Sequence, residues 1–400
     1  MSRVSRSKRH QRKKDFKRSV FVIMLAIVII AVSTSVFLAS NPVLLFYSTG
    51  GSVILESAEE DEKDPDLNPF EAFNRQKINL ALLGFDDPLL NRQSQNAPRP
   101  DTIMIISIDF STSQVSLVSI PRDSYARIPA YDLYDKINHS YMYGYERCSA
   151  EEDPHEKGLK TTLEAIQEFL GGVPIHNYIA TDIDGAAKVV DHIGGIYYEV
   201  ENDIYSHVGE GRLLLEEGYQ HLDGNKFMHY VRDRSGGGDG TRVVNQQDIM
   251  IELLKQLKSE GGLTDIPEIY RVVNQHIDTD LSFSQVTALA LFGFNVDPSE
   301  IQTHIFDGDG GMSAQNGQNI WFLDINEKTR ISLIKEVFGV NVEKRELPPL
   351  PDPATTGLQK PEDELEPEMD EIDDEETTDQ YPAEEKDRQE DATTGENGES

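Results

Sequence analysis

The sequence has a single cysteine and lacks most of the short motifs that mark familiar catalytic centres. Cys148 alone excludes an intrachain disulfide framework and a metal site of the CxxC type. The ten histidines form no HExxH pattern and no close ligand pair, which argues against a zinc site. The glycine-rich segment 236–240 lacks the GK[ST] ending of a P-loop, and no G-x-S-x-G elbow is present. The fold must therefore depend on its hydrophobic core, and the function on another kind of site.

Positive charge is scarce outside the N-terminus. The chain of 400 residues contains 37 Lys and Arg against 71 Asp and Glu, which gives a net charge of -34. Residues 351–400 alone hold 20 Asp and Glu and 3 Lys and Arg. Nonspecific nucleic-acid binding needs a basic surface, so we expect no nucleic-acid partner.

The N-terminal part of the chain contains one long apolar run. Val20 to Ala39 is apolar except for three hydroxyl residues, and nine Lys and Arg precede it. About 20 such residues span a bilayer as a helix, and the basic flank stays in the cytoplasm. A cleaved signal peptide is the alternative interpretation. We predict a single-pass protein of the plasma membrane with five parts: a cytoplasmic basic segment 1–19, a transmembrane helix 20–40, an extracytoplasmic linker 41–75, a folded extracellular domain 76–346 and a disordered acidic tail 347–400.

Apolar periodicity in the folded domain predicts an α/β fold. Residues 78–84, 103–108 and 115–120 are the first predicted strands, and residues 156–170 have apolar side chains at helical spacing. The irregular order of elements predicts a central mixed β-sheet flanked by helices, an α/β/α arrangement. Further strands are predicted at 177–183, 196–205 and 301–306, and further helices at 185–193, 225–232, from 241, and at 265–275, 283–293 and 325–338.

Two smaller features near the end of the domain have simple interpretations. Residues 307–311 superficially resemble a calcium loop but lack its spaced acceptors and closing glutamate, so we interpret them as a turn. Trp321 and Phe322 are interpreted as core residues.

Charged residues stand where three predicted strands begin or end. Asp86 follows the first strand, Asp101 precedes the second, and Arg122 and Asp123 follow the third. A solvated turn is the simpler interpretation of any one of them, but three successive strand ends favour a site mounted on rigid elements. Asp86 and Asp101 suit a shared Mg²⁺, which takes one or two carboxylates plus phosphate oxygens. Asp87 is an equal candidate.

Arginines gather around the glycine-rich segment. Arg232 and Arg234 come at the end of one predicted helix, and Arg242 lies in the first turn of the next, with Gln246 on the same face. A guanidinium group binds phosphate through two parallel N–H groups, and a helix N-terminus also favours anions. Surface ion pairs are the alternative interpretation. Together with Arg122, the pattern favours an anion site.

In combination these segments resemble the LytR–CpsA–Psr family. They occur in the family's order over about residues 77–260, after the same arrangement of basic segment and anchor. The matching pieces are Leu83-Gly84-Phe85-Asp86, Arg99-Pro100-Asp101-Thr102, Ser119-Ile120-Pro121-Arg122-Asp123, Lys136-Ile137-Asn138, His221-Leu222-Asp223-Gly224, Tyr230-Val231-Arg232-Asp233-Arg234 and Asp239 to Gln247.

The chain departs from the family pattern in three places. Asp87-Pro88 stands where an arginine usually follows the first aspartate, and the loop between Asp86 and Asp101 is slightly long. The family often has R-x-x-R-Q-Q where this chain has Arg242 to Gln247, so Asn245 replaces an arginine. These departures leave the main set of residues intact and bear on the choice of substrate.

The resemblance implies an extracytoplasmic phosphotransferase. Such enzymes transfer an anionic glycopolymer, such as wall teichoic acid or capsule, from an undecaprenyl-pyrophosphate carrier to peptidoglycan. Apolar helices would line a tunnel for the lipid. A noncatalytic module that binds polyprenyl phosphate or wall polymer is the alternative. Convergence of the aspartates and arginines on one pocket would favour the enzyme.

The resemblance also implies roles for individual residues. Asp86 and Asp101 would hold Mg²⁺ (or Mn²⁺), and Asp101 or Asp123 would take the proton from the acceptor hydroxyl. The implied catalytic residues are Asp101, Arg122 and Asp123, and the implied pyrophosphate-binding residues are Arg122, Lys136, Arg232, Arg234, Arg242 and Gln246.

Overall fold

The computed structural model describes residues 46, 77–86, 97–206, 211–235, 238–259, 266–315 and 318–350. The predicted transmembrane helix 20–40, Asp87 and the acidic tail beyond residue 350 lie outside these ranges. Within them, no helix is both long and apolar enough to cross a membrane.

A six-stranded sheet forms the centre of the domain. Its spatial order is β11 (Asp278–Thr279), β6 (Asn177–Asp182), β1 (Lys77–Phe85), β2 (Pro100–Asp109), β3 (Gln114–Ser119) and β12 (Gln302–Ile305). Strand β1 runs antiparallel to β2 and parallel to β6, and β3 runs antiparallel to β2 and parallel to β12. The sheet is therefore mixed, as predicted.

The register of the strands brings the charged ends together. Gly84 pairs with Thr102, Met104 pairs with Ser119, and Phe85 pairs with Asp182. The ends of β1, β3 and β6 and the beginning of β2 consequently lie at one edge of the sheet. This edge carries the candidate site.

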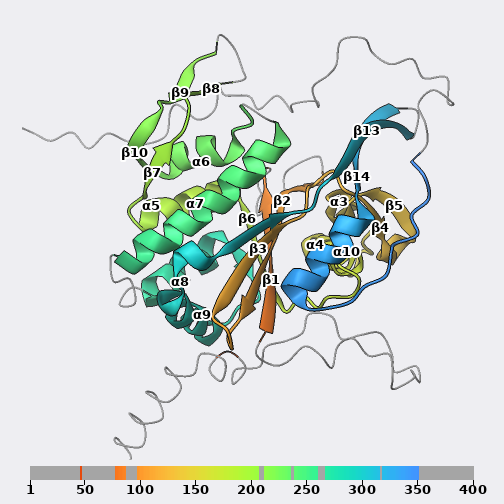
Figure 1. The fold of residues 1–400 in the computed structure, drawn as a ribbon, viewed down its shortest axis with the longest axis horizontal. Coiled ribbons are helices and arrows are strands. Elements are labelled where there is room, and N and C mark those ends of the chain that lie inside the picture. Colours follow the sequence, from red (N-terminus) through yellow and green to blue (C-terminus); the bar gives the residue numbers. More distant parts are fainter. Residues whose placement is uncertain are drawn as a thin grey trace, which may run out of the picture. The chain divides into compact units, whose positions relative to one another are not determined.

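Helices cover both faces of the sheet. Side chains alternate between the two faces along β1, so successive residues pack in different cores. Leu83 and Phe85 pack in a core with residues of α3 (His139–Glu146), α4 (Pro154–Phe169) and α10 (Glu327–Phe338). Ile78 and Leu80 pack in a second core with residues of α7 (Asp239–Ser259) and α9 (Phe283–Asn295). Figure 1 shows the two groups of helices on either side of the strands. The predicted α/β/α layering is confirmed.

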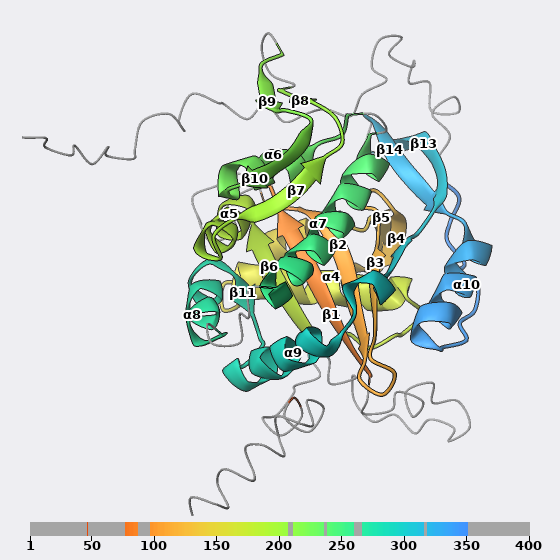
Figure 2. The same cartoon turned by 60° about the vertical axis from the view of Figure 1, so that its left-hand side comes forward.

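A third group of elements extends from the α7 side. The ribbon of β7 (Ile196–Val200) and β10 (Gly218–Leu222) packs with α6 (Gly224–Arg232) and α7 around Val200, Leu222 and Tyr230. Figure 2 shows this ribbon beside α6 and α5, with α7 crossing the sheet. The remaining elements here are α5 (Ile183–His192), β8 (Ile204–Tyr205), β9 (Leu213–Leu215) and α8 (Ile266–His276). The predicted strand 196–205 is thus two strands, with residues 201–203 between them.

Two hairpins were not predicted. One consists of β4 (Tyr125–Ile128) and β5 (Leu133–Lys136), joined through the 3-10 helix η1 (Pro129–Tyr131). The other consists of β13 (Gly308–Gln315) and β14 (Gln318–Ile325), which follow η3 (Pro298–Glu300) and β12.

The second hairpin corrects two interpretations. Residues 308–311 are not a turn but begin β13, where a Cβ on Gly310 would lie 2.1 Å from the Trp321 ring. Phe322 is buried as predicted, whereas Trp321 is 45% exposed and covers the glycine-rich strand. Neighbouring residues of a strand point to opposite faces, so these two side chains cannot share a core.

Candidate functional site

Asp101 and Arg122 meet at the edge of the sheet. Asp101 lies at the beginning of β2 and Arg122 just after β3, and Arg122 Nη1 donates a hydrogen bond to Asp101 Oδ1. Arg242, in the first turn of α7, donates from Nη2 to the Asp101 carbonyl oxygen at 2.9 Å. Residues that are 141 positions apart in the sequence are thereby joined. The structure brings these three predicted site residues together.

Asp239 lies among three of the arginines and was not singled out from the sequence. Its Oδ1 is 2.7 Å from Arg242 Nη2, 3.8 Å from Arg122 Nε and 3.9 Å from Arg234 Nε. A carboxylate in the first turn of a helix, three residues before an arginine, was the available signal. Such a carboxylate is also explained by the helix dipole alone, so the sequence did not distinguish the two roles.

Arg122, Arg234 and Arg242, which surround Asp239, form an arginine cluster in which three positive charges lie close together. Burial, together with the charges of Arg122 and Arg242, lowers the pKa of Arg234, and Asp239 and Asp101 only partly oppose this. Burial would also lower the pKa of Arg122, but the charges of Asp101, Asp123 and Asp239 outweigh burial and raise it. An additional anion beside Arg234 would be stabilised by three guanidinium groups.

Two buried guanidinium nitrogens of the cluster have no hydrogen-bond acceptor among the described residues. These are Arg122 Nε and Arg242 Nε. Buried donors are normally paired, because leaving one unpaired costs about 1–3 kcal/mol, or more for a charged group. A phosphate group has the acceptor oxygens that would satisfy both.

Asp123 is held by cations from two directions. Its Oδ1 lies 2.8 Å from Lys136 Nζ, and its Oδ2 lies 3.6 Å from Arg122 Nε. Lys136 is the last residue of β5, and the backbone N–H of Asn138 donates to the Arg122 carbonyl oxygen at 3.2 Å. The unpredicted hairpin β4–β5 therefore positions the predicted residue Lys136.

The remaining predicted residues lie at the periphery or make internal contacts. Asp86 Oδ2 is 3.4 Å from Arg232 Nη2, and both side chains are partly exposed. Gln246 Nε2 donates to the Val231 carbonyl oxygen at 3.1 Å, which joins α7 to α6. Binding of phosphate by Gln246 stays a prediction.

A relay of side-chain contacts beside the site, of which only Asp135 is buried, was not predicted from the sequence. His139 is the first residue of α3, and its Nδ1 lies 3.0 Å from Asp135 Oδ2. Its Nε2 lies 3.2 Å from Arg99 Nη1, two residues before Asp101. Tyr143 also donates to Asp135 Oδ2, at 2.7 Å. The Asp135–His139 pair thus contacts the arginine that precedes the start of β2.

The carboxylates suit a divalent cation only if a substrate completes its coordination. No group of three or more His, Cys, Asp or Glu side chains in the described ranges is arranged to hold a metal ion. Asp86 contacts Arg232 through Oδ2, and Asp101 contacts Arg122 through Oδ1, so one oxygen of each makes no ion pair with a described residue. This donor set fits Mg²⁺, which commonly uses one or two carboxylates together with substrate phosphates.

Comparisons with known proteins place the chain in a family. Residues 44–343 match the model of the LytR_cpsA_psr family. A polyisoprenyl-teichoic acid–peptidoglycan teichoic acid transferase TagU of Oceanobacillus iheyensis is 25% identical over 339 residues, which cover 84% of this chain and 98% of the relative. An uncharacterised protein of Staphylococcus aureus is 26% identical over 279 residues, covering 68% of this chain and 64% of that protein.

Solved structures share the fold. Bacillus subtilis TagV matches with a TM-score of 0.55 and 22% identity over 66% of this chain and 98% of TagV. TagT bound to LIIa-WTA matches with a TM-score of 0.52 and 21% identity over 71% of this chain and 97% of TagT. Because the family model covers most of the sequence, the chain belongs to the LytR–CpsA–Psr family.

Proposed function

We propose that this protein transfers an anionic glycopolymer, such as wall teichoic acid or capsule, from an undecaprenyl-pyrophosphate carrier to peptidoglycan. The observation that carries the proposal is the convergence of Arg122, Arg234 and Arg242 at one sheet edge, with two buried guanidinium donors that lack an acceptor among the described residues. The names of the TagU relatives, which describe teichoic acid transfer to peptidoglycan, support the same reaction.

Arginine side chains would supply most of the stabilisation. Phosphoryl transfer depends mainly on positioning and on neutralising charge that spreads over the phosphate oxygens. Arg122, Arg234 and Arg242 would bind those oxygens, and Arg232 would extend the cluster toward Asp86. Mg²⁺ (or Mn²⁺), held by Asp86 and Asp101 when bound, would neutralise further phosphate charge. Before substrate binds, Asp239 partly balances the cluster.

The acceptor is a hydroxyl group of peptidoglycan, and its proton must go to a base. Either Asp101 or Asp123 would serve as this base; each lies beside Arg122. The oxygen of the acceptor would form a bond to the phosphorus while the bond to the carrier phosphate breaks. The proton would pass to the carboxylate, and the carrier would leave as polyprenyl phosphate.

A transfer assay tests this proposal. The full-length protein would be incubated with a polyprenyl-pyrophosphate-linked saccharide and peptidoglycan oligomers, with Mg²⁺ or with EDTA. Metal-dependent product that disappears in Arg122→Ala, but not in the control Arg127→Ala on strand β4, would support the enzyme. Cleavage of pyrophosphate without transfer would indicate a pyrophosphatase. Tight binding of the lipid without turnover would indicate the noncatalytic binding module.

The membrane location is a second part of the proposal. We propose that residues 20–40 anchor the protein once in the plasma membrane, with the catalytic domain outside the cell. The apolar run and its basic flank support this arrangement. Protease added to intact protoplasts should remove the domain and leave a short protected fragment. Complete protection of the domain would contradict this topology.

A further inference from the structure

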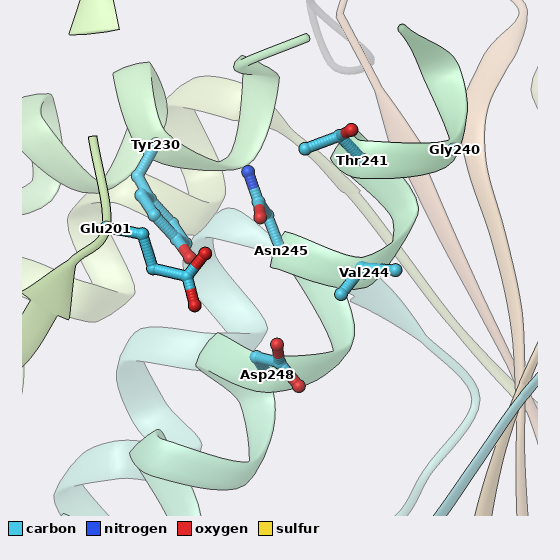
Figure 3. A pocket seen from close by; sticks show the side chains of 7 residues that line it. All are labelled: Glu201, Tyr230, Gly240, Thr241, Val244, Asn245 and Asp248. Carbon is cyan, nitrogen blue, oxygen red and sulfur yellow. The ribbon is translucent and has the colours of Figure 1, made fainter. Parts of the chain in front are cut away.

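A cavity lies beside α7, on the face of the helix next to the one that carries Arg242. It has a volume of about 370 Å³, within the usual range for small-molecule sites of about 300–1,000 Å³. Its principal lining residues are Glu201 after β7, Tyr230 from α6, and Thr241, Val244, Asn245 and Asp248 from α7. Figure 3 shows the α7 side chains along the cavity, with Glu201 beside Tyr230.

The cavity and the candidate site share one helical turn. Arg242 points toward Asp101, whereas its neighbour Thr241 and the residue one turn later, Asn245, line the cavity. An α-helix with its side chains is about 10–12 Å wide, so a ligand in the cavity lies within one or two sugar rings of the arginines. The cavity is therefore well placed for a group attached to the reacting substrate.

The cavity is acidic, and two of its polar side chains make no hydrogen bond to another described residue. Its lining includes two carboxylates, Glu201 and Asp248, and no Lys, Arg or His. Both carboxylates are exposed to solvent, and partial desolvation together with the charge of Glu201 raises the pKa of Asp248, which Lys255 only partly opposes. No hydrogen bond from the side chain of Thr241 or Asn245 to another described residue is present. A cationic ligand with hydrogen-bonding groups would relieve the repulsion and use these side chains.

Asn245 adds no positive charge to balance the two carboxylates of the cavity. The pattern R-x-x-R-Q-Q, which this chain resembles, has an arginine at this position. An arginine here would lie in the same cavity as Glu201 and Asp248, where it would pair with them and fill part of the space. Asparagine leaves the carboxylates without that partner and offers an amide that donates and accepts hydrogen bonds.

We propose that this cavity is a binding site for the protonated primary amine of an amino sugar. The ammonium group donates three hydrogen bonds, which the carboxylates of Glu201 and Asp248 and the side-chain amide oxygen of Asn245 would accept. Hydrogen bonds between charged partners are strong. Thr241 would contact a sugar hydroxyl. Two carboxylates fall short of the oxygen ligands that Ca²⁺ requires, which favours the amine. That this amino sugar belongs to the transferred or accepting glycan rests on the proposed function.

Binding measurements with simple sugars test the site. Full-length protein would be titrated with glucosamine, N-acetylglucosamine and glucose at a pH where glucosamine is protonated. We expect glucosamine to bind at least about tenfold more tightly than the other two, since only it makes charge-assisted hydrogen bonds. Asn245→Arg and Asp248→Asn should each reduce its affinity by about tenfold. The exposed control Glu336→Gln on α10 should have no effect.

Several results would overturn the proposal. The three sugars could bind with equal affinity, or glucosamine could fail to bind. Both variants could bind glucosamine as tightly as the unchanged protein, or they could lose Ca²⁺ binding while glucosamine binding stays the same. Unchanged thermal melting and inorganic pyrophosphate binding would show that the variants are folded. The titration contains no carrier lipid, so its result is separate from that of the transfer assay. If glucosamine binds but no glycopolymer is transferred, the proposed function fails and the amine site remains.

Discussion

Arg330 and the arginines at the sheet edge differ in how completely their hydrogen bonds are satisfied. The contrast is between individual arginines, since Arg345, which pairs with the same Glu327 as Arg330, also has two buried Nη atoms without an acceptor among the described residues. Arg330 on α10 is fully buried, and its guanidinium donates to Glu327, to the Phe169 carbonyl oxygen at 2.8 Å and to the Glu343 carbonyl oxygen at 2.8 Å. At the sheet edge, Arg122 and Arg242 each leave a buried Nε without an acceptor among the described residues.

The difference distinguishes Arg330, a fully paired structural arginine, from Arg122 and Arg242, whose unpaired donors lie in the candidate site. Every nitrogen of Arg330 has a partner, and its contacts join α10 to the end of α4 and to the segment after α10. The arginines at the sheet edge share one carboxylate, Asp239, at distances of 2.7 to 3.9 Å. Buried charge that is not fully paired is a recurrent feature of binding and catalytic sites.

Arg330→Met should have the largest effect on stability. Removing one partner of a buried ion pair typically costs about 3–5 kcal/mol, because the other charge remains buried. The neighbouring exposed residue provides the control Lys328→Met, which should change the free energy of unfolding little. Urea denaturation measures both. A loss below 1 kcal/mol for Arg330→Met would mean that a fully paired buried arginine does not stabilise the fold.

Arg234→Ala should have the opposite profile. Arg234 is crowded by Arg122 and Arg242, so we expect its removal to leave the free energy of unfolding unchanged or slightly higher. Loss of a group that stabilises developing charge typically lowers the rate by about 10²–10³-fold. Transfer rates and urea denaturation on the same samples check both parts. Destabilisation comparable to Arg330→Met would remove the contrast between the clusters.

The variant Asp239→Asn tests whether the Asp239 carboxylate competes with phosphate for the arginines or holds the arginines in position. If it competes, removing its charge should raise the affinity for inorganic pyrophosphate by about three- to tenfold, since one unfavourable charge interaction is lost. Isothermal titration without added metal measures this. Weaker binding would show that Asp239 positions the arginines. The control Asp309→Asn on β13 should leave the affinity unchanged.

The smallest predicted effect is a change in acid stability. Burial disfavours ionisation of Glu327, but hydrogen bonds from Arg330 and Arg345 outweigh it and lower the pKa of Glu327. A carboxyl group with a lowered folded pKa stabilises the protein above its unfolded pKa, about 4.3, and loses this contribution as the pH falls through the folded value. In Glu327→Gln, the decline in stability below about pH 4.3 should therefore be shallower. An unchanged slope would exclude this linkage.

The sheet and the acidic and basic ends of its strands were predictable because the apolar runs are long and end abruptly. β1, β2 and β3 appear in the sequence as such runs, and Asp101 and Arg122 flank two of them. Sequence also predicted that Arg242 begins a helix. Their meeting point depends on strand register, which the sequence did not specify.

What the sequence did not reveal are contacts between side chains of different elements. Asp239 became a site residue only when α7 docked on β2, and the Asp135–His139–Arg99 relay depends on the unpredicted strand β5. The hairpin β4–β5 was missed because its strands have four residues each, too few for a clear periodic pattern. The hairpin β13–β14 has longer strands, but β13 begins with the glycine-rich stretch 308–311, which has no apolar alternation. The cavity lined by Asn245 likewise depends on where α6 and α7 meet.

The hydrogen bonds between Gln247 of α7 and the sheet have a consequence for biosynthesis. Gln247 donates to Ser119 Oγ at 2.9 Å and to the His304 carbonyl oxygen at 2.9 Å, so one side chain joins strands that are far apart in the sequence. Contacts of such long range form late in folding, because the loops between them must close first. A nascent chain that has emerged only as far as Arg122 lacks Arg234 and Arg242 and has no complete site. Activity should therefore appear in a single step, after the whole domain has been synthesised.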